Sequence, residues 1–240
     1  MAFIHRTLCG LLLAACLMDQ ADGATLQVSP VKVDFVPGQN AAGLALNNPG
    51  DTPVYGQVRV FRWDQDASGD VLSPSTEVVA SPPIIQLAGH GHQLIRLVRV
   101  QPGNGTTEQS YRLLIDEIPP PDTDKHVGVV IRMRYSVPVF VAPKNEVAPQ
   151  LNWQVVRQDG HWLLRLDNRG QRHTQVGALT LQDAAGKALE VSNGLLGYAL
   201  AGHARQWPLR SGSPVKLDGP LLIKVNLDGQ PSTFKVTGEG

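Results

Sequence analysis

Residues 127–141 carry an unusually long alternation of apolar and polar positions. A period of two predicts a β-strand, because successive side chains of a strand point to opposite faces of the sheet. The apolar row on one face is longer than an ordinary strand needs. Its members are Val127, Val129, Ile131, Met133, Tyr135, Val137 and Val139. Such a row is an aggregation hazard at a sheet edge, so either the fold buries it or the chain offers it to a partner.

Shorter strand patterns fill the region before this stretch. Turn signals such as Asn47-Asn48-Pro49-Gly50 separate them at roughly 8–12-residue spacing, which favours a β-sandwich. Pro30 interrupts the first pattern, as is typical of an edge strand. The expected strands are Leu26–Phe35, Ala42–Leu46, Val54–Trp63, Val71–Val79, Ile84–Leu87, Gln93–Val100 and Tyr111–Ile118.

A linker that contains Pro143 and Pro149 precedes a second series of strand patterns. These are Leu151–Val156, Trp162–Asn168, Gln175–Gln182, Leu195–Ala199, Arg205–Leu209, Leu221–Leu227 and Thr233–Val236. We therefore predict an all-β chain with two β-sandwich domains, residues 24–145 and 146–240, after a targeting segment at residues 1–23.

Residues 1–23 are typical of a signal peptide that directs export. The apolar run Leu8–Met18 is too short to span a bilayer, and small residues precede Ala24 at the expected cleavage site. Both cysteines, Cys9 and Cys16, leave with this peptide, so we expect an exported chain without a disulfide. The box Leu13-Ala14-Ala15-Cys16 also resembles a lipoprotein cleavage site, which makes a lipid anchor on Cys16 the alternative.

Composition and motifs argue against catalysis and nucleic-acid binding. The formal net charge is zero, which gives no support for a nucleic-acid binder. No nucleophile elbow, phosphate loop or zinc-binding His-Glu-x-x-His helix is present. His90 and His92 lie in a turn without a third ligand nearby, so we expect no metal site. The chain is expected to have no catalytic residue, no cofactor and no small-molecule substrate.

An ordered set of segments spans nearly the whole exported chain. Its members are Leu26–Phe35, Asn47-Asn48-Pro49-Gly50, Gln57–Trp63, Ser81-Pro82-Pro83, Gln93–Leu97, Tyr111–Pro119, Val137–Val141, Trp162–Asn168 and Gly197–Leu209. Taken in this order, the set resembles the periplasmic chaperones of the chaperone–usher pilus pathway. It is most similar to the archaic branch, which assembles Csu-type pili.

The resemblance implies two immunoglobulin-like domains set at an angle, with a cleft between them. It also implies two partners: pilus subunits that lack their final strand, and an outer-membrane usher. The long strand would be lent to a subunit, a form of β-strand addition. The donor residues would be Val127, Val129, Ile131, Met133 and Tyr135. From the pattern alone, burial of this row in the chain's own sandwich is the alternative, and self-association could mask the row in the free chain.

In the family, two basic residues hold the terminal carboxylate of the subunit, and a paired cation suits a carboxylate. Lys32 occupies the first of these positions. The second falls at Val137-Pro138, which departs from the family pattern. The candidate replacements are Arg96, Arg132 and Arg134, and Arg96 is preferred because it lies on the same face of its strand as Val98. A solvated surface cation is the alternative for each of them.

Two other classes of protein stay open on sequence grounds. A structural pilus subunit or adhesin would be a β protein too, although two complete sandwiches argue against it. A carbohydrate-binding β-sandwich would need exposed aromatic side chains. The chain has four tryptophans and four tyrosines, and the tryptophans are spread along expected strands, where burial is the common use.

Overall fold

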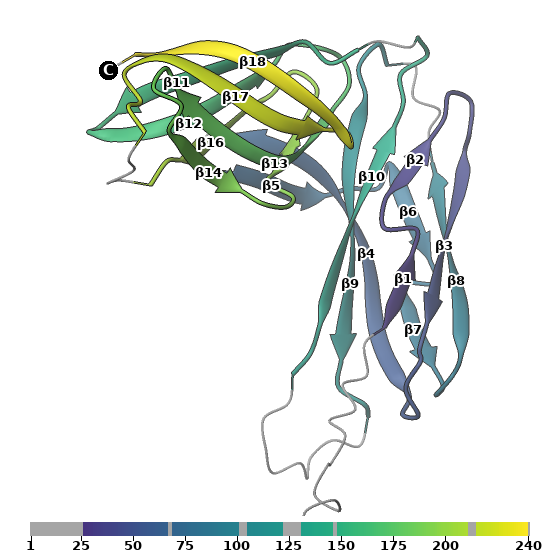
Figure 1. Ribbon diagram of the computed structural model, residues 1–240. Helices are drawn as coiled ribbons and strands as arrows, with labels where there is room; N and C mark the ends of the chain where they lie inside the picture. The colour runs from purple at the N-terminus through teal and green to yellow at the C-terminus, as the bar shows by residue number, and fades with distance from the viewer. Residues whose placement is uncertain are drawn as a thin grey trace, which may run out of the picture.

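The computed structural model describes residues 26–66, 69–100, 105–121, 131–145, 148–210 and 215–239. Two β domains are set at an angle to each other, so that the second lies across one end of the first (Figure 1). No helix occurs within these residues, and therefore none is long and apolar enough to cross a membrane. The predicted all-β, two-domain, immunoglobulin-like fold is confirmed.

The first domain is a sandwich of two sheets. One sheet has the order β1-β3-β8-β6, and the other has the order β2-β10-β9-β4-β5, with β7 paired to β4. The strands are β1 (Gln27–Ser29), β2 (Val33–Phe35), β3 (Ala41–Asn47), β4 (Val54–Asp66), β5 (Gly69–Pro74), β6 (Val78–Ser81), β7 (Ile84–Leu87), β8 (His92–Arg99), β9 (Gln109–Ile118) and β10 (Arg134–Val141). The core between the sheets includes Phe35, Leu44, Ile95, Leu113 and Val139, all fully buried.

Two strand patterns of the sequence each resolve into two strands. The predicted strand Leu26–Phe35 divides near Pro30 into β1 and β2, which belong to different sheets. Strand β1 pairs with β3, whereas β2 pairs with β10. Likewise, the weak pattern Val71–Val79 divides into β5 and β6, which belong to different sheets. Predicting each as a single strand was wrong, because alternation does not show which sheet supplies the neighbour.

The long strand predicted at residues 127–141 is shorter in the part that the structure describes. Residues 127–130 lie outside the described residues, and β10 begins only at Arg134. From there β10 pairs antiparallel with β9 over its whole length, but with β2 only at Val139–Val141. Its segment Arg134–Pro138 is therefore a sheet edge on the side away from β9, within the described chain.

The second domain is one strongly curved, eight-stranded sheet with the order β14-β13-β17-β18-β11-β12-β16, and β15 pairs with β13. Its strands are β11 (Leu151–Gln158), β12 (His161–Asn168), β13 (Thr174–Asp183), β14 (Ala188–Ser192), β15 (Gly197–Ala199), β16 (Ala204–Pro208), β17 (Gly219–Leu227) and β18 (Gln230–Glu239). Its core includes Leu164, Leu166, Leu181 and Ile223. Strand β14 was missed by the sequence analysis, since it is short and half-exposed.

The two domains share a small aromatic core at their junction. Trp63 and Phe140 from the first domain pack with Tyr198 and Leu200 from the second. The ring of His173 stacks on Phe140 at a centroid distance of 3.5 Å, and its Nδ1 lies 2.6 Å from the buried carboxylate of Glu108. These buried contacts join the domains through side chains of both.

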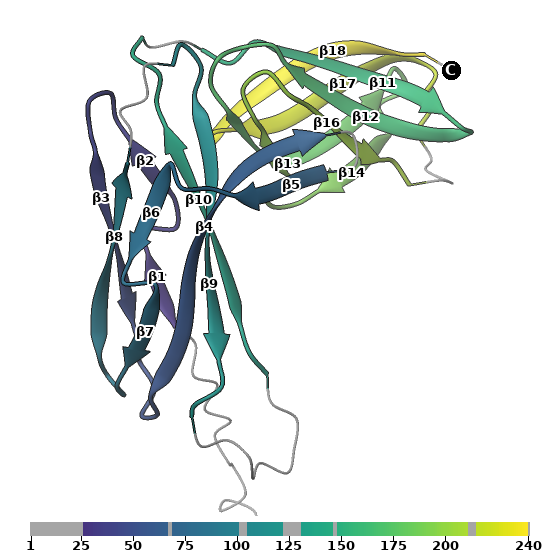
Figure 2. The ribbon, with the colours of Figure 1, turned by 180° about the vertical axis from the view of Figure 1, so that it is seen from behind.

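The hairpin of β4 and β5 extends past the first sandwich and lies beside the second domain (Figure 2). Buried Gln65, near the end of β4, bridges the gap with its side-chain amide. Its Nε2 donates to the carbonyl oxygen of Tyr198 at 2.9 Å, and its Oε1 accepts from the backbone N–H of Leu200 at 2.9 Å. The amide thus pairs two buried backbone groups of the second domain, as a neighbouring strand would.

Replacing Gln65 with leucine should lower the free energy of unfolding by about 2–4 kcal/mol, because a buried backbone group without a partner costs roughly 1–3 kcal/mol. Urea denaturation followed by tryptophan fluorescence measures the change. Gln86→Leu is the matched control, since its exposed amide donates to the hydroxyl of Tyr55 rather than to a buried backbone group, and a change within about 0.5 kcal/mol is expected. Equal losses in both variants would contradict the bridging role of Gln65.

Candidate functional site

The apolar row of the long strand divides at Tyr135. Above it, Val137, Val139 and Val141 are buried in the core of the first domain. Below it, the exposed fraction rises to 42% at Met133 and 79% at Ile131. One row of side chains therefore changes from core to surface within the described residues, and its buried part belongs to the chain's own sandwich. Val127 and Val129 lie outside the described residues.

Tyr135 is half-buried at the rim of this sandwich. Its hydroxyl donates to Glu117 Oε1 at 3.2 Å, and burial together with the neighbouring carboxylate raises the pKa of the phenol. The backbone N–H of Met133 donates to Glu117 Oε2 at 3.2 Å, and the N–H of Glu117 donates to the carbonyl of Met133 at 3.0 Å. Glu117 thus holds the chain beside β9 as far as Met133.

The outer face of β9 and β10 below the junction carries a charge cluster. Asp116 accepts hydrogen bonds from Arg134 and from Arg59, the latter at 2.6 Å. Burial opposes ionisation of Asp116, but these two guanidinium groups outweigh it and lower the pKa of its carboxyl. Arg134, a predicted anchor, is therefore already engaged by a carboxylate of its own sheet.

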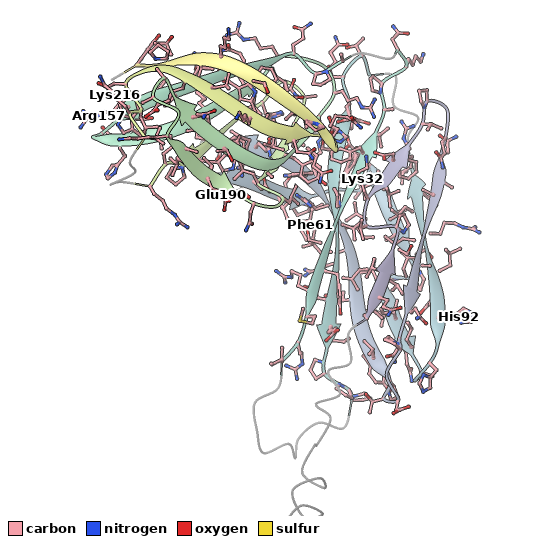
Figure 3. All side chains as sticks on the ribbon, in the orientation of Figure 1. Lys32, Phe61, His92, Arg157, Glu190 and Lys216 are labelled. Atoms are coloured by element: carbon pink, nitrogen blue, oxygen red, sulfur yellow. The ribbon has the colours of Figure 1, made fainter. Side chains whose placement is uncertain are left out.

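The other predicted anchors lie in different places. Lys32 lies near the domain junction (Figure 3) and pairs with Asp34 at 2.9 Å. Arg132 is exposed just before β10. Arg96 is exposed on β8, in the other sheet, and Figure 3 shows His92, from the same strand, on the side away from the second domain. Arg96 was preferred because an unpaired cation on the face of Val98 would be costly if that face were buried. The expected burial was wrong, because the core face of β8 carries Ile95 and Leu97.

Arg112 was missed by the sequence analysis and lies at the junction. It is on β9 directly opposite Pro138 of β10. Its guanidinium carbon lies 3.6 Å from the centroid of the Trp63 ring, a cation–π contact, and its side chain is 15% exposed. Burial lowers the pKa of Arg112. The sequence shows a basic residue at position 112, but only the pairing of β9 with β10 places this residue opposite Pro138.

The charges of Lys32 and Arg112 both act on Tyr198 of the second domain. Desolvation raises the pKa of Tyr198, while the positive charges of Arg112 and Lys32 oppose this shift. Both cations belong to the first domain: Lys32 lies just before β2, and Arg112 lies on β9. We call Lys32 and Arg112 the basic site.

Within the described residues, the four tryptophans are not exposed as a platform for a sugar. Trp63, Trp153 and Trp207 are buried, and Trp162 packs against the core of the second domain. Within the described residues, no group of three or more His, Cys, Asp and Glu side chains could hold a metal ion. These positions argue against the carbohydrate-binding alternative.

The described chain thus combines two immunoglobulin-like domains with a free strand edge on β10, an arrangement that suits β-strand addition. The chain belongs to the family of pili and flagellar-assembly chaperones, since the family model of the PapD N-terminal domain matches residues 25–146. A comparison with curated proteins found no match.

Solved structures of pilus chaperones resemble the whole described fold. One is the CsuC–CsuE chaperone–tip adhesion subunit pre-assembly complex from archaic Csu pili of Acinetobacter baumannii, with 25% identity and a TM-score of 0.70, covering 90% of this chain and 100% of that chain. The Escherichia coli chaperone DraB is 21% identical, with a TM-score of 0.61 and coverages of 90% and 97%. The complex of the SafA pilin with the SafB chaperone from Salmonella enterica is 17% identical, with a TM-score of 0.61 and coverages of 89% and 96%.

Proposed function

We propose that this protein is a periplasmic chaperone that binds pilus subunits by donor-strand complementation and delivers them to an outer-membrane usher. The observation that carries the proposal is the division of one apolar row into a buried and an exposed part. A strand that is anchored in a folded core at one end and exposed at the other can complete a second sandwich without unfolding the first.

The donor residues of this proposal are Val127, Val129, Ile131, Met133 and Tyr135. Each apolar side chain that a subunit buries fully contributes about 1.5–3 kcal/mol before the ordering of the complex is subtracted. The unpaired edge Arg134–Pro138 supplies backbone groups for a subunit strand, although Pro138 lacks an N–H. Main-chain pairing then supplies affinity, and the alternating side chains supply register.

The subunit's terminal carboxylate would bind at the basic site. Lys32 keeps the role expected from the sequence, and Arg112 takes the second position in place of Arg96, Arg132 or Arg134. Position 138 cannot supply a cation, but Arg112 projects from the paired position on β9. A guanidinium can bind a carboxylate with two parallel hydrogen bonds.

Co-expression with a small secreted β subunit encoded beside the chaperone gene tests the proposal. A complex with one copy of each chain should co-purify from the periplasm, and the subunit expressed alone should be degraded or aggregate. A subunit that folds and accumulates to the same level without this protein would contradict the chaperone function.

The periplasmic location rests on a cleaved signal peptide in residues 1–23. Mass spectrometry of the exported protein should find an N-terminus at Ala24, because small residues precede that position. A lipidated N-terminal Cys16 would contradict this expectation and would place the protein at a membrane surface.

A further inference from the structure

The β4–β5 hairpin brings a carboxylate to the basic site. Asp70 on β5 pairs directly with Gln65 on β4, and Gln65 Nε2 donates to Asp70 Oδ1 at 2.9 Å. Gly69 precedes it with a φ of +145°, and a Cβ there would lie 3.4 Å from a terminal nitrogen of Arg205. The hairpin therefore contacts the second domain at Arg205, and Asp70 lies at this contact.

Asp70 faces two guanidinium groups, one from each domain. Its Oδ2 lies 3.8 Å from Arg112 Nη2, and its Oδ1 lies 3.6 Å from Arg205 Nη1. Both distances exceed those of a hydrogen bond, which are about 2.7–3.2 Å. The side chain of Asp70 is 40% exposed, whereas those of the two arginines are 15% and 16% exposed. Asp70 is thus a loosely held, partly exposed counterion to two arginines that are largely enclosed.

Two cations share this one carboxylate, so the cluster of Asp70, Arg112 and Arg205 keeps a net positive charge. Arg205 Nε is buried and has no hydrogen-bond partner within the described residues. The indole Nε1 of Trp63, the ring on which Arg112 stacks, also lacks one there. Buried donors without an acceptor are rare in folded proteins, so these two donors and the net positive charge make a further acceptor favourable at this cluster.

We propose that Asp70 is an internal counterion that occupies the carboxylate side of Arg112 in the free protein and competes with the terminal carboxylate of a subunit. The inference rests on the proposed function, which assigns Arg112 to that carboxylate. The terminal carboxylate of a subunit would accept two parallel hydrogen bonds from Arg112. Asp70 would then retain its hydrogen bond from Gln65, its ion pair with Arg205 and its contact with solvent. Asp70 thereby weakens the hold of the basic site on a chain terminus, which favours release of the terminus.

Titration of the exported chain with N-acetylglycine, a small mimic of a chain terminus, tests this proposal. Indole and guanidinium signals in NMR spectra report binding, and N-acetylglycinamide is the uncharged control probe. Asp70→Asn should bind N-acetylglycine about fivefold more tightly than the wild type, the factor expected for one unit charge about 4 Å away in a highly polar medium. Asp51→Asn is the matched charge control, since Asp51 is exposed away from the junction, where it pairs with His90, and it should leave the affinity unchanged.

The outcomes separate this inference from the proposed function. Loss of binding in Arg112→Gln together with wild-type affinity in Asp70→Asn would overturn the role of Asp70 alone. Wild-type affinity in Arg112→Gln would overturn the anchor itself and, with it, this inference. An equal gain in Asp51→Asn would show an effect of net charge and would overturn the local competition. Asp70→Ser is a second variant if the asparagine changes the domain angle measured by small-angle scattering.

Discussion

Ile131→Asp is expected to abolish co-purification with a pilus subunit while leaving the chaperone folded. Ile131 is 79% exposed, so the carboxylate stays hydrated in the free protein and should change its stability by less than about 0.5 kcal/mol. In the complex, the same carboxylate would be buried in the apolar groove of the subunit, which costs several kcal/mol without a partner. Pull-down from periplasmic extracts measures the complex, and urea denaturation measures the stability of the variant.

Leu94→Asp is the matched control for this variant. Leu94 is 58% exposed on β8, in the other sheet of the first domain. The substitution makes the same chemical change on a surface that the proposal leaves free of the subunit. Intact capture by Ile131→Asp, or equal loss in both variants, would contradict the assignment of Ile131 to the donor strand.

Arg112→Gln should weaken subunit capture by about tenfold to a hundredfold, because a hydrogen bond to a charged group contributes about 1.5–3 kcal/mol. Glutamine keeps a polar side chain over Trp63 but removes the positive charge. Surface plasmon resonance of the chaperone against a subunit peptide with a free carboxylate measures the loss. The same peptide with a C-terminal amide should bind the variant and the wild type about equally.

Arg96→Gln provides the comparison for Arg112. Arg96 is exposed on β8, and removing its charge should leave capture within about twofold of the wild type, as is usual for a surface change. A larger loss in Arg96→Gln than in Arg112→Gln would return the anchor to the residue preferred from the sequence. A loss with the amide peptide equal to that with the acid would indicate that Arg112 acts on the fold rather than on the carboxylate.

The domain junction explains why Arg112 suits this role better than an ordinary surface arginine. Its guanidinium is fixed against Trp63 and lies 5.6 Å from the centroid of the Tyr198 ring. Little conformational entropy remains to be lost when it binds, which favours affinity. The same enclosure makes its charge costly, and Asp70 offsets only part of that cost.

Much of the fold could be predicted because its physical cause is local. Alternation with a period of two marks strands such as β4 and β12, and turn residues such as Asn47 and Pro49 mark where strands end. Strand partners are not local. The division of Leu26–Phe35 between two sheets depends on pairing with β3 in one sheet and with the distant β10 in the other, and alternation alone carries no signal for it.

The sequence by itself determined the all-β class, the presence of two domains and the apolar face of the long strand. Only the tertiary structure decided where that face leaves the core, because Val137 and Met133 have the same place in the alternation. Val137 is packed in the core of the first domain, whereas Met133 is exposed. The choice between Arg96 and Arg112 has the same cause. A period of two separates the two faces of a strand, but which face the second domain covers depends on how the sandwiches pack.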